Sequence, residues 1–506
     1  MTSTGDHGTW TGKPAGLIGI VILLLAGFCF GRPAVSLSPK DGPPTTTLRV
    51  SGSGFTPYAQ IDIYFDSQDQ ALVMADAAGA FSQIAIQAPK SAVPGNHWVT
   101  AAERSGHLVK QEKFEVHVNW TEFHTKDMRR ENPYENVLNV DNVGTLQVLG
   151  SRYTYGAVHH SPAVVDGVVY SGSDGNRTSR AYALNARTGA RLWSDTIGLP
   201  PVSSPAVANG LVYIGYWDYV LALDASTGAT VWSYETYCGR DAPPTVANGV
   251  VYVASADIGN CEPYVWALDA QTGARLWKSL VVGAVPTSPA IANGLVYIGS
   301  NTTWTVTALD ASTGQPAWIY WNAGPVESSP AVANGVVYVG SDYGNVYALD
   351  AHTGALVWVY AIGTAVGSSS PAVANGVVYV GCTDGNVYAL DAGTGAKLWN
   401  YTTGSMVSSS PAVANGVVYV GSNDKSVYAL DAQTGTELWS YATGAPVDSS
   451  PAVANGVVYV GSADGNIYAF GLPKGLAKHA PKRPDLKTLR PDFNLKVYGR
   501  PAAGAD

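Results

Sequence analysis

The stretch SSPAVANGVVYVGSDYGNVYALDAHTGALVWVYAIG, which runs from Ser328 to Gly363, decides the fold. It contains four short apolar runs that are separated by turn signals. Asn334-Gly335 divides the first two runs, and this dipeptide favours a type I′ hairpin because both residues accept positive φ. A polar turn divides the second and third runs, and Gly354 lies in the turn before the fourth. The stretch therefore predicts four antiparallel strands, A to D, in a sheet so apolar that it must stack on similar sheets.

Copies of this stretch fill most of the chain. The proline that opens strand A returns after about 40 residues each time, at Pro162, Pro205, Pro244, Pro289, Pro330, Pro371, Pro411 and Pro451. Each of the first seven copies has a tryptophan in strand D, four residues after the glycine of the C–D turn, namely Trp193, Trp232, Trp277, Trp318, Trp358, Trp399 and Trp439. Four strands in a repeat of this length are typical of a β-propeller blade.

The eighth copy, Pro451 to Phe470, ends after strand C. A segment suited to strand D, Thr145 to Tyr155, lies instead before the first copy. Pairing of the two ends would remove the open edges of the ring. The sequence therefore predicts an all-β, eight-bladed propeller of four-stranded blades over residues 144–470. Gly150 or Ser151 takes the place of the missing tryptophan, so we expect this blade to be the weakest packed.

The N-terminal end of the chain predicts export. Residues 1–14 are polar, and residues 15–31 form an uncharged apolar run. Its length lies between that of a signal-peptide core and that of a membrane-spanning helix. We expect an N-terminal hydrophobic helix that is either a transmembrane anchor in the cell membrane or a signal sequence. Both alternatives place the remaining domains outside the cytoplasm, either membrane-anchored or secreted.

Residues 35–118 predict a separate β-sandwich. They alternate between apolar and polar side chains, most clearly in FEVHV from Phe114 to Val118, and turn residues separate the runs. The stretch VSGSGFTPYAQIDIYF resembles the bacterial Ig-like domains of exported proteins. The resemblance implies an Ig-like sandwich of about seven strands that acts as a spacer.

Two further segments flank the propeller. Residues 119–143 are polar with few apolar anchors, so we expect a linker that approaches the ring. Residues 471–506 are basic and rich in proline, and we expect a disordered tail. The whole chain carries a net charge of −9, which argues against nucleic acid as a partner. Its charged fraction of 13% fits blades that are buried on both faces.

The repeat resembles that of a known family. The motifs SPAVANGVVYVGS, YALDA and xTGxxxW resemble the PQQ-like (pyrroloquinoline-quinone-type) propeller repeat, and ENVLNVDNVGTLQ resembles the segment that leads into it. The resemblance implies that the seven strand-D tryptophans dock on the neighbouring blades. It also implies a turn-capping role for the aspartates that precede the C–D turns, Asp224, Asp269, Asp310, Asp350, Asp391 and Asp431.

The resemblance leaves three functions open. Quinoprotein dehydrogenases of the family hold a quinone and a calcium ion over the ring axis and use two adjacent cysteines. The cysteines here, Cys29, Cys238, Cys261 and Cys382, are not adjacent, and the repeats lack long insertions. We therefore predict a non-catalytic protein-interaction or ligand-binding module, with no catalytic or metal-ligating residues and without bound PQQ or calcium. The alternatives are a PQQ-dependent dehydrogenase and a purely structural cell-envelope protein.

One face of the ring is the predicted binding surface. In an antiparallel blade the B–C and D–A loops emerge on the same face. These loops are short and uniform in copies five to eight but irregular and aromatic in copies one to four. We expect them to bind a protein or saccharide ligand through Tyr216, Trp217, Tyr219, Tyr237, Arg240, Trp304 and Trp321. Cys238 and Cys261 lie in two such loops of one copy, and export favours a disulfide between them.

Overall fold

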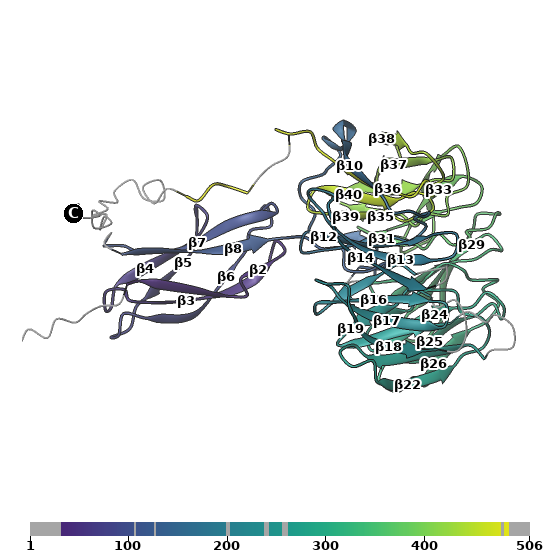
Figure 1. Cartoon of the computed structure of the whole chain (residues 1–506), viewed down its shortest axis with the longest axis horizontal. Coiled ribbons are helices and arrows are strands. Elements are labelled where there is room, and N and C mark those ends of the chain that lie inside the picture. Colours follow the sequence, from purple (N-terminus) through teal and green to yellow (C-terminus); the bar gives the residue numbers. More distant parts are fainter. Residues whose placement is uncertain are drawn as a thin grey trace, which may run out of the picture.

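The computed structural model describes residues 32–105, 108–125, 128–198, 203–236, 242–255, 262–476 and 480–484. Figure 1 shows two β-rich bodies, a sandwich built from β1–β8 and a ring built from the later strands. The helix expected at residues 15–31 lies outside the described residues. Within the described ranges, no helix has the length and apolar character needed to cross a membrane. The one helical element among the named elements of these ranges is a short 3₁₀ turn, η1 (Val143–Thr145).

The N-terminal body is a β-sandwich. Its two sheets have the strand orders β1-β3-β6 and β2-β8-β7-β4-β5. Their bounds are β1 (Ala34–Ser38), β2 (Asp41–Gly42), β3 (Thr47–Ser53), β4 (Gln60–Phe65), β5 (Gln68–Met74), β6 (Phe81–Gln87), β7 (Gly95–Glu103) and β8 (Val109–Val116). Inward-facing residues such as Leu48, Ile63 and Phe114 form one buried core between the sheets. The Ig-like assignment of this sandwich stays a prediction.

The ring consists of eight blades of four strands each, as the sequence predicts, and the short strand β9 (Glu131–Asn132) adds a parallel fifth strand to blade 7. The strands of blades 1 to 4, in order from A to D, are β11 (Ala163–Val165), β12 (Val168–Asp174), β13 (Ser179–Asn185) and β14 (Arg191–Gly198); β15 (Ala206–Ala208), β16 (Leu211–Tyr216), β17 (Tyr219–Asp224) and β18 (Thr230–Glu235); β19 (Thr245–Ala247), β20 (Val250–Ala254), β21 (Tyr264–Asp269) and β22 (Arg275–Leu280); β23 (Ala290–Ala292), β24 (Leu295–Gly299), β25 (Val306–Asp310) and β26 (Pro316–Tyr320).

Blades 5 to 8 follow the same order. Their strands are β27 (Ala331–Ala333), β28 (Val336–Gly340), β29 (Asn345–Asp350) and β30 (Leu356–Ala361); β31 (Ala372–Ala374), β32 (Val377–Gly381), β33 (Asn386–Asp391) and β34 (Lys397–Thr402); β35 (Ala412–Ala414), β36 (Val417–Gly421), β37 (Ser426–Asp431) and β38 (Glu437–Ala442); β39 (Ala452–Ala454), β40 (Val457–Gly461), β41 (Asn466–Gly471) and β10 (Gln147–Tyr153).

The two ends of the propeller close the ring. Strand β10 pairs antiparallel with β41, so the predicted closure is confirmed. Gly150 lies opposite Ala469, after a bulge at Leu149. Trp358 lies opposite Ala348 after the same kind of bulge in blade 5. Gly150 is therefore the residue that replaces the tryptophan of the other blades.

The turns have the conformations that the sequence predicts. Asn334 and Gly335 have φ of 50° and 78°, as a type I′ turn requires. In the C–D turn, Asp350 Oδ1 accepts hydrogen bonds from the Thr353 N–H at 2.8 Å and hydroxyl at 2.7 Å. These bonds lower the pKa of the exposed Asp350 carboxyl. The aspartate therefore stabilises the turn. This structural role explains the presence of an aspartate at this position without invoking catalysis.

The blades contact one another through the strand-D tryptophans. In six of the seven, the indole Nε1 donates a hydrogen bond to the backbone carbonyl of the residue that follows strand C in the next blade. For Trp358 the acceptor is Ala392, at 2.9 Å. The corresponding pairs are Trp193–Ala225, Trp232–Ala270, Trp277–Ala311, Trp318–Ala351 and Trp399–Ala432, while Trp439 reaches Leu146.

Candidate functional site

The segment that the sequence predicts as a linker lies along the central channel of the propeller. Trp120 and Val164 of blade 1 exchange two backbone hydrogen bonds of 2.7 Å. The carbonyls of Thr121, Met128, Arg129 and Arg130 accept from strand A of blades 2, 5, 6 and 7, at Val207, Val332, Val373 and Val413. Glu122 accepts from Val246 of blade 3, and Asn132 donates to Val453 of blade 8. The segment thus joins the innermost strands of blade after blade.

Arg130 lies in this channel beside blades 7 and 8. Its side chain is fully buried, and the guanidinium donates to the carbonyls of Phe123, Ser410, Pro411 and Pro451. Its carbon Cζ lies 4.4 Å from the centroid of the Phe123 ring, in a cation–π contact. Burial lowers the pKa of Arg130 to about 9, so the charge is kept at neutral pH.

The described residues around Arg130 do not fit a calcium ion. A calcium ion takes charged oxygen ligands, whereas the cation Arg130 would repel it. Glu122, a buried carboxyl of the same segment, has its pKa raised to about 8 by burial. It is therefore mostly protonated at neutral pH. Among the described residues, no group of three or more His, Cys, Asp and Glu side chains is placed to hold a metal ion.

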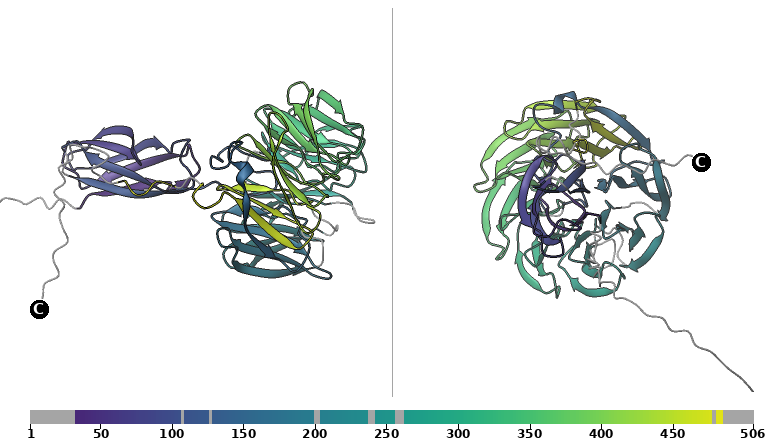
Figure 2. Two further views of the ribbon diagram at one scale, coloured as in Figure 1. Left: turned by 90° about the horizontal axis from the view of Figure 1, so that it is seen from above. Right: turned by 90° about the vertical axis from the view of Figure 1, so that its left-hand side faces the viewer.

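The sandwich lies on the face of the ring that carries the A–B turns (Figure 2). The Val118 N–H donates to Asn455 Oδ1 in the A–B turn of blade 8, at 2.7 Å. Asn415, in the A–B turn of blade 7, donates to the Leu138 carbonyl at 2.8 Å. Because the B–C and D–A loops emerge at the opposite strand ends, the predicted binding face points away from the sandwich.

The candidate residues of blade 2 occupy one B–C hairpin. Tyr216 and Tyr219 stack, with ring centroids 5.5 Å apart and an angle of 18° between planes. Trp217 at the tip is 41% exposed and has φ of 44°. The D–A side of the blade lies beside this hairpin, because the Thr236 N–H donates to the Asp218 carbonyl at 2.7 Å. Burial raises the pKa of Tyr216.

In blade 4 the candidates Trp304 and Trp321 lie on neighbouring loops. Trp304 ends the B–C loop with φ of 60° and is 41% exposed, and Trp321 is 53% exposed. The Ala323 N–H donates to the Trp304 carbonyl at 3.0 Å, which joins the two loops. The Trp304 ring contacts Tyr343 of blade 5, with centroids 5.4 Å apart. Tyr237, Arg240, Cys238 and Cys261 lie outside the described residues, so their predicted roles stay predictions.

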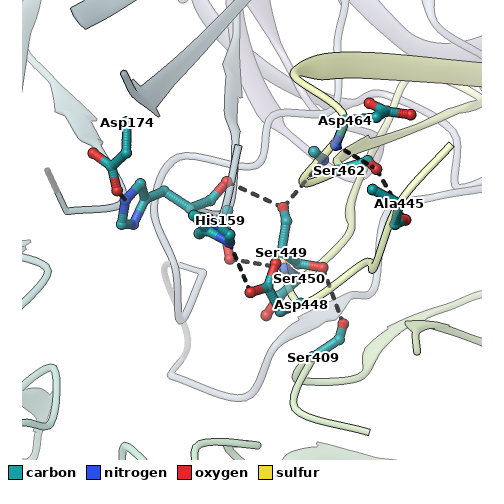
Figure 3. A network of polar contacts seen from close by, with 12 residues as sticks. His159, Asp174, Ser409, Ala445, Asp448, Ser449, Ser450, Ser462 and Asp464 are labelled. Atoms are coloured by element: carbon teal, nitrogen blue, oxygen red, sulfur yellow. Dashed lines mark hydrogen bonds and ion pairs between the residues drawn. The ribbon is translucent and has the colours of Figure 1, made fainter. Parts of the chain in front are cut away.

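Two histidines at the junction of blades 8 and 1 face carboxylates on this same side of the ring (Figure 3). His159 Nδ1 lies 2.8 Å from Asp448 Oδ2, and the hydrogen bond to Asp448 raises the pKa of His159. His160 Nε2 lies 3.0 Å from Asp174 Oδ2. The sequence shows both histidines but not their partners, because Asp448 is far away along the chain. These contacts between histidine and carboxylate fit a structural role at the junction.

A belt of serines joins the blades just inside this face. The Ser370 N–H donates to Ser410 Oγ at 2.8 Å, and the Ser410 N–H donates to Ser450 Oγ at 2.9 Å. The Ser450 N–H donates across the closure to Ser161 Oγ at 3.2 Å. The repeated Ser-Ser-Pro motif thus provides hydrogen bonds from blade to blade. The sequence pattern alone did not predict this role.

A comparison with family models identifies the family. The model described as "Outer membrane protein assembly factor BamB" matches residues 177–318, 262–408 and 383–500, which together span more than half of the chain. The chain belongs to this family of PQQ-like β-propeller proteins. A search of curated proteins found no match.

Solved structures with the same fold include dehydrogenases and a BamB protein. A europium-containing methanol dehydrogenase superposes with a TM-score of 0.62 at 17% identity, covering 70% of this chain and 98% of that one. The quinohemoprotein alcohol dehydrogenase of Comamonas testosteroni gives 0.61 at 19%, covering 72% and 82%. BamB of Moraxella catarrhalis gives 0.54 at 23%, covering 65% and 100%. At these identities the likeness concerns the fold.

Proposed function

We propose that this protein is a non-catalytic propeller that binds a protein partner through its B–C and D–A loop face. One observation carries the proposal: Trp217 and Trp304 are both exposed and both have positive φ. A bulky residue in this conformation is strained, and such strain is typical of functional sites. Tryptophan is also the residue type most often found at the energetic centre of protein interfaces.

The neighbouring blade shows what an unstrained loop would contain. Ser300 N–H donates to Thr305 O in blade 4, and Ser341 N–H donates to Asn345 O in blade 5, so the two loops close in the same way. The residue before the acceptor is Trp304 in blade 4 but Gly344, with φ of 78°, in blade 5. Glycine adopts this conformation without strain. A tryptophan at this position therefore favours a role in binding over a role in folding.

The filled channel supports the same proposal. Arg130 and Trp120 are buried against the strand-A side of the blades, which leaves the B–C and D–A loops as the variable surface. We further propose that the domains lie outside the cytoplasm, as the name of the matching family model suggests for its members. Cell fractionation together with protease accessibility of intact cells tests this location.

Capture from the native cell envelope tests the binding face. The variant with Trp217, Trp304 and Trp321 all changed to Ala should lose the captured protein. Met406→Ala is the control, because Met406 is 44% exposed in a regular D–A loop of the same face. The assignment would be refuted if only the control variant lost capture, or if neither variant lost it. A glycan array probed with the same proteins tests the saccharide alternative, and dye reduction with added quinone and calcium would refute the non-catalytic proposal.

Trp304→Gly separates binding from stability. This substitution relieves the backbone strain of the positive φ at residue 304 but removes the ring contact with Tyr343. We expect the free energy of unfolding to stay within about 1 kcal/mol of the wild type, while capture weakens at least as much as in Trp304→Ala. Retained capture by both variants would mean that Trp304 is not part of the binding site.

A further inference from the structure

Six of the blade junctions contain the same indole pocket. The strand-D tryptophan of one blade lies against the C–D turn glycine of the next. An added Cβ at Gly395 would lie 2.7 Å from the Trp358 ring, and one at Gly435 would lie 2.6 Å from the Trp399 ring. The acceptor for Trp358 Nε1 is Ala392 O, which also accepts from Tyr338 OH at 3.1 Å. Each pocket thus binds an indole through a ring surface and one carbonyl.

The junction that closes the ring has the same parts without the indole. Gly150 takes the place of the tryptophan, and an added Cβ there would meet nothing within 4 Å. The turn glycine of blade 1 is Gly189, and it too has open space around its missing Cβ. Tyr459 OH donates to Ala186 O at 3.2 Å, as Tyr338 does to Ala392. Among the described residues, no indole N–H shares the Ala186 carbonyl.

A cavity of about 150 Å³ lies at this position. Its lining includes Leu149, Gly150, Leu184, Ala186, Gly189 and Tyr459. The lining is mixed, since Arg152 and Arg187 also border the cavity. A cavity of about this volume can hold an aromatic ring the size of benzene. The cavity is open at the rim of the ring, where Leu149 is 51% exposed. A group from outside can therefore enter where the side chain of strand D enters in the other blades.

We propose that this closure pocket binds the indole of a tryptophan side chain supplied by a partner protein. The indole would lie between Gly189 and Tyr459, with its N–H donated to Ala186 O. The six filled junctions define this occupant, because they show which group the same turn glycine and carbonyl accept. The pocket is on the rim of the propeller and apart from the loop face, so its test does not depend on the partner of that face.

The test compares the full-length protein with two variants that change the number of pockets. The probe is N-acetyl-L-tryptophanamide, titrated calorimetrically. The wild type should bind roughly one equivalent, since a matched cavity saturates at one ligand. Gly150→Trp should bind none, because its own indole fills the pocket. Trp399→Gly should bind roughly two equivalents, because it opens a second pocket of the same design at Gly435.

Two further measurements keep the result interpretable. If Gly150→Trp or Trp399→Gly does not fold, Gly150→Met and Trp399→Ala replace them with the same expectations. Benzofuran has the shape of indole but no N–H, so it should bind about fivefold more weakly than indole if the bond to Ala186 forms. Binding of free indole without binding of N-acetyl-L-tryptophanamide would overturn the side-chain proposal. Binding by the Trp399 variant alone, with none by the wild type, would overturn the site itself.

Discussion

Arg130 Nε donates a hydrogen bond of 2.9 Å to the carbonyl oxygen of Pro411, which lies 281 residues later in the chain. This bond connects the segment between the two domains to the strand-A end of blade 7. Because the guanidinium also reaches Ser410 and Pro451, one side chain spans two blades from inside the ring. The segment before the propeller is therefore part of its core.

Arg130→Met should destabilise the propeller. The methionine fills part of the volume but leaves buried carbonyls without donors, and we expect a loss of about 3 kcal/mol in the free energy of unfolding. Denaturant titration of the full chain measures it. Arg275→Met is the control, because Arg275 is exposed and should change stability by less than about 0.5 kcal/mol. Equal effects of the two substitutions would contradict the structural role of Arg130.

Deletion of residues 145–155 should open the ring. It removes β10, leaves β41 as an unpaired edge and takes away Leu146, the acceptor of Trp439. An exposed edge strand promotes pairing between molecules. We expect a lower melting temperature and aggregates in light scattering. An unchanged melting temperature together with an unchanged molar mass would count against closure by this strand.

Glu122 should make stability depend on pH. Burial raises the pKa of its carboxyl from 4.5 to about 8 in the folded protein, although the Val246 N–H opposes the shift. The folded state therefore binds the proton more tightly than the unfolded chain. This contribution is present below pH 4.5 and is lost progressively as the pH rises to about 8.

Glu122→Gln removes this titration and can keep an acceptor for the Val246 N–H, which lies 2.9 Å from Glu122 Oε2. The variant should match the wild type near pH 4 and exceed its stability above pH 8. Glu115→Gln is the control, because the side chain of Glu115 is 53% exposed. Parallel stability curves for the wild type and Glu122→Gln would show that Glu122 does not titrate as expected.

The predicted bond between Cys238 and Cys261 is tested by peptide mapping without reductant. Closing that loop should add roughly 3 kcal/mol in the chain-entropy model. Cys382 is the internal control, because it is buried and free, and burial raises the pKa of its thiol. We expect iodoacetamide to label Cys238 and Cys261 in the folded protein only after reduction. Labelling of both before reduction would exclude the disulfide.

Much of the fold could be predicted because each signal is local. The Asn-Gly turns, the apolar strand runs and the Asp-x-x-Thr-Gly turns act within a few residues. Asp350 contacts Thr353, and Asn334 and Gly335 form a turn by themselves. The closure strand was also predictable, because a repeat that lacks strand D must take it from elsewhere. The sequence likewise predicted that the irregular loops of a blade share one face, and the contact between Trp304 and Ala323 agrees with this.

By itself, then, the sequence determined the repeat and the number of blades, because strand period and turn chemistry depend on neighbours along the chain. Only the tertiary structure decided that residues 120–125 and 128–132 line the channel, that Trp217 and Trp304 have positive φ and that a cavity lies between Gly150 and Gly189. Each of these depends on groups that the closed ring brings together from distant blades. No local sequence pattern specifies contacts between groups so far apart along the chain, so the positions of these groups follow from tertiary packing alone.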